Sequence, residues 1–300
     1  LIGNIGKPYL ATLLTKNQPE IYVAELSSHQ LFNLKKSPHV AVFLNFFPEH
    51  LDYYKNLKEY LMAKANITLW QGPEDFFIYN KENKYIKKIA KKTLAKKIPI
   101  SFDQKILKKY SIKKIPFVGN FYLLNIAAAA KVAEIFKIKK EIVKKVIEKF
   151  RPLLHRLEFV GKFKGVYFYN DSLSTIPETT ILALLSFKKK VKTLIAGGFD
   201  RGLDFKNLAK EIKNQGVETL ILFPKTGEKI KKEVEKLDKE RKISIFLVNS
   251  MKEAVKLAFK KTPKEKVCLL SPASPSFGMF ANYRERGNLF KKYVKYYGKK

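Results

Sequence analysis

The chain has 300 residues, of which 46% are hydrophobic, and its 60 lysines and arginines against 27 acidic residues give a formal net charge of +33. This length and apolar content indicate a soluble globular protein with room for two domains, each with its own core. No apolar run reaches the length of a membrane-spanning helix, so a membrane protein is excluded.

The basic excess is of the size that proteins binding nucleic acid or membrane surfaces carry. Only six of the basic residues are arginines, although arginine is the side chain best suited to bidentate recognition of phosphates and base edges. The lysines are spread over helical patterns at positions typical of solvated faces. We therefore expect no specific nucleic-acid partner and no membrane partner, and we keep a basic nucleic-acid-binding module as an alternative of low weight.

The single cysteine, Cys268, lies in an apolar, strand-like run. One cysteine excludes an intramolecular disulfide framework, and this predicts a cytoplasmic location, where thiols stay reduced.

Apolar, β-branched runs alternate with amphipathic helical patterns along the whole chain, which predicts an α/β fold of βαβ units with parallel sheets. In the first half, strands are predicted at Ile21–Glu25, Val40–Asn45 and Phe76–Tyr79. Helices are predicted at Leu57–Leu69, Phe121–Phe136 and Glu141–Phe150. The basic stretch Asn83–Lys97 is interpreted as a surface helix and loop.

Pro152 stops the last of these helices, so a domain boundary is predicted there, with one domain over residues 1–152 and a second over residues 153–300. The second domain opens with a predicted hairpin of Glu158–Phe163 and Val166–Asn170. Four further strands, with a helical pattern between each successive pair, give it a Rossmann-like order. They are Thr193–Ala196, Thr219–Phe223, Ser244–Val248 and Lys266–Leu270.

Three polar residues of the first domain follow strand-like runs or lie on the helix after them. Glu25 ends one run, His50 lies in a loop-like PEHLD segment after the next, and Lys64 lies on the following helix. The carboxyl edge of a parallel sheet is where such an arrangement presents a metal site. Taken singly, Glu25 is better explained as a capping carboxylate, His50 as a local hydrogen-bonding group and Lys64 as a solvated side chain.

Five more blocks occur in a fixed order: GNIGKPYL near the start, HRLE at His155–Glu158, YNDSLST at Tyr169–Thr175, AGGFDRGLDF at Ala196–Phe205 and LLSPASPSFGMFANYRERG at Leu269–Gly287. Each block alone is weak evidence, but their order and spacing together are specific. With the segment from Ala24 to Asn66, they make the chain resemble the glutamate-adding members of the Mur ligase family over nearly its whole length.

The resemblance implies the remnant of a P-loop-type, parallel-sheet ATPase domain followed by a Rossmann-like α/β domain. It implies an ATP-dependent amide ligase that adds D-glutamate to UDP-N-acetylmuramoyl-L-alanine in peptidoglycan precursor synthesis, with ATP and Mg²⁺ as cofactors. The γ-phosphoryl group of ATP would activate the substrate carboxylate, and the amine of glutamate would attack the acyl phosphate. A monomer is expected for the full-length enzyme.

The resemblance also implies roles for the metal-site residues. Glu25 and His50 would coordinate Mg²⁺, and a carbamylated Lys64 would position a metal ion. Carbamylation requires a neutral amine, which predicts that burial or neighbouring cations depress the pKa of Lys64. Lys64, His50 and Asp171 form the predicted catalytic set.

For the nucleotide, the resemblance places Asn125 against the adenine ring and Arg156 on the phosphates. Asp171 would hold the ribose or order the metal and phosphate network. A His-Asn pair is usual in the family just before the asparagine, and here Phe121 and Tyr122 occupy those positions. The adenine pocket is therefore only partly supported.

For the other substrates, the resemblance implies that Asn4 contacts the muramoyl group, and a set of five residues is expected at the glutamate site: Thr175, Arg201, Ser276, Phe277 and Tyr283. Arginine can bind a carboxylate in a bidentate manner. The usual lysine after Asp-Ser and the usual asparagine before the proline are replaced by Leu173 and Ile176. An L-glutamate-adding enzyme, another Mur ligase or a folylpolyglutamate-type ligase therefore stays an alternative.

The sequence holds no glycine-rich phosphate loop of the type GxxxxGK[ST], which the family carries before the GNIG block. We expect the chain to be the carboxyl-terminal two-thirds of a ligase, without ligase activity alone. A non-catalytic interaction protein is a further alternative, which would tolerate alanine at the predicted site residues.

Overall fold

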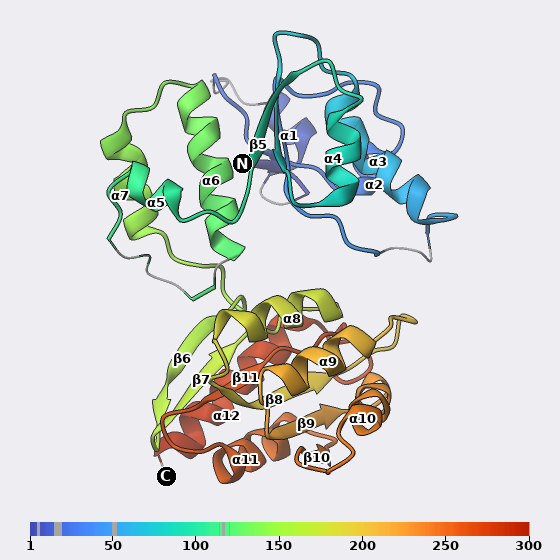
Figure 1. Ribbon diagram of the computed structural model, residues 1–300, viewed down its shortest axis with the longest axis vertical. Helices are drawn as coiled ribbons and strands as arrows, with labels where there is room; N and C mark the ends of the chain where they lie inside the picture. The colour runs from blue at the N-terminus through green and yellow to red at the C-terminus, as the bar shows by residue number, and fades with distance from the viewer. Residues whose placement is uncertain are drawn as a thin grey trace. The chain divides into compact units, whose positions relative to one another are not determined.

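The computed structural model describes residues 1–4, 7–14, 20–49, 53–113, 115, 118–119 and 121–299 (Figure 1). The chain splits into two compact units: unit 1 holds Leu1–Ser111 and Tyr122–Val143, and unit 2 holds Ile112–Phe121 and Lys144–Lys300. The split falls within helix α7 (Lys140–Lys149), earlier in the chain than the boundary expected at Pro152. The domain limits at residues 152 and 153 stay a prediction.

Unit 1 contains two parallel sheets. β1 (Ile2–Gly3) pairs with β2 (Ala24–Glu25). In the other sheet, β4 (Phe76–Asn80) lies between β3 (Val40–Phe43) and β5 (Lys96–Ile100). The core of unit 1 forms where this second sheet packs against helices, since Phe77 of β4 is fully buried.

The helices of unit 1 include α3, which begins and ends where the sequence predicts. They are α1 (Tyr9–Leu13), α2 (Ser28–Leu31), α3 (Leu57–Leu69), α4 (Lys84–Ala90), α5 (Lys105–Lys109) and α6 (Phe121–Ile135). Asn56 fixes the start of α3 because its side chain accepts a hydrogen bond from the backbone N–H of Glu59 at 3.0 Å. Glu59 in turn accepts one from the N–H of Lys55 at 2.7 Å.

Two predictions for unit 1 need correction. The strand expected at Ile21–Glu25 is reduced to the two residues of β2. The stretch Asn83–Lys97, expected to be a surface helix and loop, contains α4 and the first residues of β5. The sequence KKIPI of β5 does not look like a strand, but β5 is an edge strand, where lysines and a proline are tolerated.

Unit 2 is built on a six-stranded sheet in the order β10-β9-β8-β11-β7-β6, in which every pairing is parallel except the β6–β7 hairpin. The strands are β6 (Glu158–Phe163), β7 (Val166–Asn170), β8 (Val191–Gly197), β9 (Thr219–Phe223), β10 (Ser244–Leu247) and β11 (Val267–Leu270). The predicted hairpin is confirmed, and so is the predicted α/β class.

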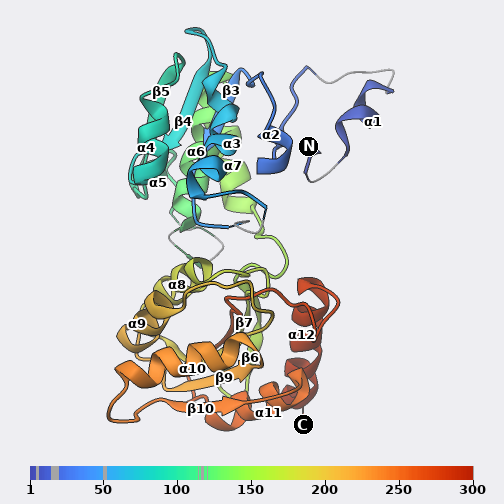
Figure 2. The ribbon, with the colours of Figure 1, turned by 90° about the vertical axis from the view of Figure 1, so that its right-hand side faces the viewer.

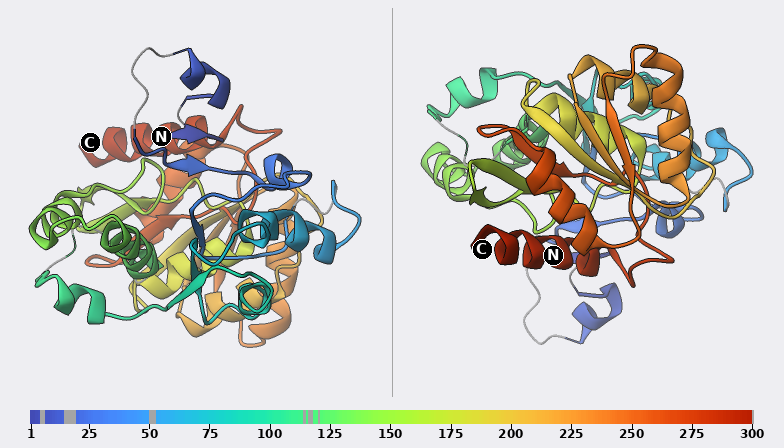
Figure 3. Two further views of the ribbon diagram at one scale, coloured as in Figure 1. Left: turned by 90° about the horizontal axis from the view of Figure 1, so that it is seen from above. Right: turned by 90° about the horizontal axis from the view of Figure 1, so that it is seen from below.

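Helices cover both faces of this sheet, as Figures 2 and 3 show. The helices of unit 2 after α7 are α8 (Pro177–Ser186), α9 (Lys206–Asn214), α10 (Thr226–Leu237), α11 (Met251–Lys261) and α12 (Tyr283–Lys299). Side chains alternate between two cores, because successive strand residues point to opposite faces. Leu220 packs with α8, α9 and α10, whereas Ile221 packs with α11 and α12.

Because β7, β8, β9 and β11 run parallel, the loops that follow them emerge at one edge of the sheet. This edge carries the polar blocks that the sequence singled out in the second domain. Among the described residues, no helix combines the length and the apolar character needed to cross a membrane.

Candidate functional site

The site residues of unit 1 begin at the ends of β1 and β2. The side-chain amide of Asn4 donates a hydrogen bond to Oε1 of Glu25 at 2.9 Å, and the backbone N–H of Asn4 donates to the Glu25 carbonyl at 2.8 Å. Gly3 makes this close approach possible, since a Cβ at that position would lie 2.3 Å from the Glu25 carbonyl oxygen. The structure thus brings together two predicted site residues that are far apart in the sequence.

Helix α3 places Lys64 in the same region. Asn66 ties α3 to α2, since its side-chain amide donates to the carbonyls of Leu31 at 2.8 Å and Phe32 at 3.1 Å. The Nζ of Lys64 lies 5.3 Å from the ring centroid of Tyr60.

The electrostatic surroundings of Lys64 link it to two carboxylates. Burial lowers the pKa of Lys64, and the negative charges of Glu49 and Glu25 act in the opposite direction. A lowered pKa enlarges the fraction of neutral amine, which is the form that carbamylation requires. Glu49, which directly precedes His50, was not among the predicted site residues.

A hard cation such as Mg²⁺ prefers oxygen ligands, and the carboxylates of Glu25 and Glu49 supply them. His50, the other predicted ligand, lies outside the described residues. Within the described part of the chain, no group of three or more His, Cys, Asp or Glu side chains is arranged to hold a metal ion. The donor chemistry present fits Mg²⁺ with part of its shell completed by water or phosphate oxygens. Asn125, expected at the adenine ring, lies exposed on α6.

In unit 2, Asp171 follows the last residue of β7 and is fully enclosed. Its Oδ2 accepts hydrogen bonds from the hydroxyl groups of Ser174 at 2.5 Å and Ser271 at 2.8 Å, and its Oδ1 accepts one from the N–H of Leu157 at 3.1 Å. Burial raises the pKa of Asp171 to about 6, against the opposing effects of these donors and of the positive charge of Arg156. The structure therefore pairs Arg156 and Asp171 electrostatically, as the two motifs suggested.

We expect the stability of unit 2 to depend on pH through Asp171. Because its folded pKa of about 6 lies above the unfolded value of 3.8, the stabilisation from proton binding is complete below pH 3.8 and is lost as the pH rises through 6. The full change is about 3 kcal/mol. Urea unfolding at pH 4 to 7 should show this slope in the wild type and a flatter one in Asp171→Asn. The exposed control Asp204→Asn should keep the wild-type slope, and an equal slope in Asp171→Asn would contradict the assignment.

A second buried network holds the HRLE segment against β7. Asn170 lies with its side-chain amide 2.9 Å from Nδ1 of His155 and 3.0 Å from Oε2 of Glu158. Lys291 on α12 binds Oε1 of Glu158 at 2.9 Å. The imidazole of His155 packs directly against Gly287, where a Cβ would lie only 2.2 Å from its Nδ1. This network positions Arg156, which follows His155 in the chain.

The predicted glutamate-site residues lie on the loops at the carboxyl edge of the sheet. Arg201 lies on the loop after β8, with its Cζ 5.7 Å from the ring centroid of Phe277 on the loop after β11. Ser276 is buried on that same loop, and Thr175 is half-buried on the loop after β7. Tyr283 begins α12, and its carbonyl accepts a hydrogen bond from Ser172 at 2.8 Å. Four of the five residues therefore come from neighbouring loops of one edge, and Tyr283 comes from the start of α12.

Arg286 on α12 was not predicted as a site residue, and its side chain is fully buried. Its guanidinium donates to Oγ of Ser172 at 3.0 Å, to the carbonyl of Ser172 at 2.8 Å and to the carbonyl of Ser274 at 3.0 Å. No carboxylate in the described ranges forms an ion pair with it. Burial lowers the pKa of Arg286 to about 9, which leaves it charged at neutral pH. Arg286 thus ties together the loops after β7 and β11.

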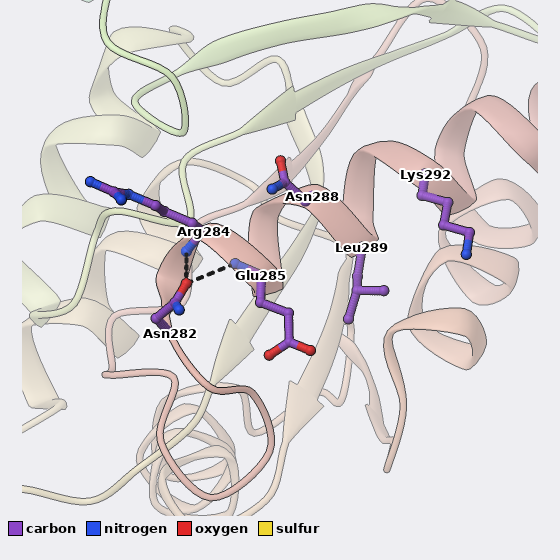
Figure 4. A pocket seen from close by; sticks show the side chains of 6 residues that line it. All are labelled: Asn282, Arg284, Glu285, Asn288, Leu289 and Lys292. Carbon is purple, nitrogen blue, oxygen red and sulfur yellow. Dashed lines mark hydrogen bonds between the residues drawn. The ribbon is translucent and has the colours of Figure 1, made fainter.

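An open hollow of about 580 Å³ lies along the start of α12 (Figure 4). It is lined by Asn282, Arg284, Glu285, Asn288, Leu289 and Lys292. Asn282 caps the helix, because its Oδ1 accepts hydrogen bonds from the N–H groups of Arg284 and Glu285 at 3.0 Å each. None of the predicted site residues lines this hollow.

Comparison with known proteins agrees with the division of motifs along the chain. Residues 3–133 match the family model described as the Mur ligase middle domain, and residues 155–274 match that of the Mur ligase, glutamate ligase domain. A UDP-N-acetylmuramoylalanine–D-glutamate ligase of Acetivibrio thermocellus is 37% identical over 97% of this chain and 67% of its own length. The enzyme of the same name from Aquifex aeolicus is 38% identical over 97% of this chain and 70% of its own length.

Solved structures support the fold. MurF from Acinetobacter baumannii has a TM-score of 0.66 at 14% identity, covering 91% of this chain and 64% of its own. Folylpolyglutamate synthase of Mycobacterium tuberculosis, solved with ADP, has a TM-score of 0.60 at 12% identity, covering 79% of this chain and 61% of its own. The chain thus spans about two thirds of the length of the proteins that it matches.

Proposed function

Since the chain belongs to the Mur ligase family, we propose that it forms the ATP-binding and glutamate-binding part of an enzyme that joins D-glutamate to UDP-N-acetylmuramoyl-L-alanine. The observation that carries the proposal is the 37% identity to a ligase of that name over 97% of the chain. This similarity extends through both units. The enzyme would act in the cytoplasm in peptidoglycan precursor synthesis, as a monomer when full length.

The reaction would proceed in two steps. The γ-phosphoryl group of ATP is transferred to an oxygen of the substrate carboxylate, and ADP leaves. The amine of glutamate then attacks the acyl carbon, phosphate leaves, and the nitrogen loses a proton. Phosphoryl transfer depends mainly on positioning and on neutralising charge.

The residues of this chain would divide these tasks. Mg²⁺, when bound, would neutralise phosphate charge, and Glu25 with His50 would hold it beside a carbamylated Lys64. Arg156 would bind the phosphates of ATP, and Asp171, held by two serine hydroxyls, would order the ribose or the phosphate network. Asn125 is proposed for the adenine ring.

For the other two substrates, Asn4 would contact the muramoyl group beside Glu25. Arg201 would bind a carboxylate of glutamate, with the other predicted residues lining the same loops. Those residues are Thr175, Ser276, Phe277 and Tyr283.

A second candidate function differs in the amino acid that is added. Leu173 stands where the family usually has a lysine, and it lies half-buried on the loop after β7. A missing cation removes one partner for a substrate carboxylate, so an enzyme that adds L-glutamate is the alternative.

The test is a chimaeric enzyme in which the part of the Aquifex aeolicus ligase that precedes the matched region is fused before Leu1. We expect phosphate release that requires MgATP, UDP-N-acetylmuramoyl-L-alanine and D-glutamate together, with the isolated chain assayed in parallel. Higher activity with L-glutamate would favour the alternative. A folded chimaera that binds ATP but forms no amide with either isomer would contradict both.

A further inference from the structure

Lys225, a residue outside all the predicted sites, has a strained backbone at the carboxyl edge of the sheet. It follows β9 and precedes α10, with φ of 66° and ψ of −79°. This conformation is costly for any residue except glycine. Its neighbour Thr226 holds the turn in place, since its hydroxyl donates to the carbonyl of Gly198 at 3.0 Å and lies 2.8 Å from the hydroxyl of Ser274. A lysine in such a strained turn suggests that its side chain has a functional role.

The side chain of Lys225 reaches Phe199, which pairs with Phe277 of the predicted glutamate site. Its Nζ lies 5.6 Å from the ring centroid of Phe199. Phe199 contacts Phe277 edge to face, with 6.1 Å between the ring centroids. Arg201 lies over Phe277. Two cations therefore flank one pair of aromatic rings, on loops that follow β8, β9 and β11.

The local charges leave both cations available for a ligand. Asp200 forms its ion pair with Lys229, at 2.5 Å. Among the described residues, no carboxylate lies within ion-pair distance of Lys225 or Arg201, and both side chains are exposed. The positive charge of Lys225 also acts on Asp200 at longer range and helps to lower the pKa of that carboxyl, after the closer Lys229. Two positive charges without a direct ion-pair partner match a ligand that carries two carboxylates.

We propose that Lys225 is a specificity-determining residue that binds the side-chain carboxylate of glutamate while Arg201 binds the α-carboxylate. This inference rests on the proposed function, because it takes glutamate as the amino-acid substrate. Lys225 supplies from β9 the cation that the family usually has at the position of Leu173. The rings of Phe199 and Phe277 contact the methylene groups between the two carboxylates.

The experiment is a calorimetric titration of the chain with D-glutamate and with D-glutamine, which has one carboxylate fewer. The wild type should bind D-glutamate about tenfold more tightly than D-glutamine, because one charge-assisted contact is lost. Lys225→Met should bind the two ligands equally, and Lys225→Arg should restore the preference. The control Lys232→Met, which removes an exposed lysine of α10, should behave as the wild type.

A glycine variant separates binding from folding. Lys225→Gly should lose the preference for D-glutamate while its melting temperature rises by about 2–4 °C, because the backbone strain is relieved. If Lys225→Met keeps the wild-type preference, the role of Lys225 is wrong and the glutamate site stands. If the wild type binds neither ligand, the glutamate site of the proposed function is wrong, and this inference is wrong with it.

Discussion

Replacement of Lys64 by alanine is expected to lower the turnover of the chimaeric ligase by about 10²–10³-fold, which is the usual cost of removing one group that stabilises charge in the transition state. The expectation rests on a half-buried amine whose pKa is lowered by burial, on a helix that Asn66 ties to α2. Stability should change little, since the fold already disfavours the charged form of Lys64. Phosphate release in the presence of all three substrates measures the effect.

Two further variants decide how Lys64 acts. Lys64→Arg keeps a positive charge but cannot be carbamylated, so it should lose as much activity as Lys64→Ala. Lys58→Ala, at an exposed position of the same helix, should retain wild-type turnover. Appreciable activity in Lys64→Arg would show that a positive charge suffices, and it would contradict the carbamate.

The central strands β9 and β11 of unit 2 could be predicted from the sequence because each is a short, nearly continuous apolar run, as buried parallel strands are. The hairpin of β6 and β7 has the predicted bounds. Unit 1 was harder. β1 and β2 have only two residues each, which is too short for any periodicity, and β5 reads as a basic loop because it lies at a sheet edge.

The site residues of unit 2 differ in how far the sequence alone could identify them. Asp171 stands in a motif at a strand end, and its burial among hydroxyl groups follows from that position. Lys225 is one of many lysines, and only its backbone angles and its aromatic neighbours distinguish it. Arg286 looks like a solvated helix residue in YRERG, because nothing in that sequence shows that the loops of Ser172 and Ser274 close over it.

Replacement of Arg286 by alanine is expected to destabilise unit 2 by about 2–4 kcal/mol. The change removes a fully buried side chain and leaves the carbonyls of Ser172 and Ser274 without their donor, in a region that water does not reach. Urea unfolding followed by circular dichroism measures the loss. Trp70, the only tryptophan, lies in unit 1, so its fluorescence follows that unit separately and should keep the wild-type midpoint.

The matched variants separate the charge of Arg286 from its shape. Lys at position 286 keeps a cation but cannot donate to Ser172 and Ser274 at once, so Arg286→Lys should recover only part of the loss. Arg284→Ala removes an exposed arginine two residues away and should cost less than about 1 kcal/mol. Because Arg286 joins the loops that carry Thr175 and Ser276, loosening it should also weaken D-glutamate binding by the remaining folded protein. An Arg286→Ala chain as stable as the wild type would show that these loops are held by other contacts.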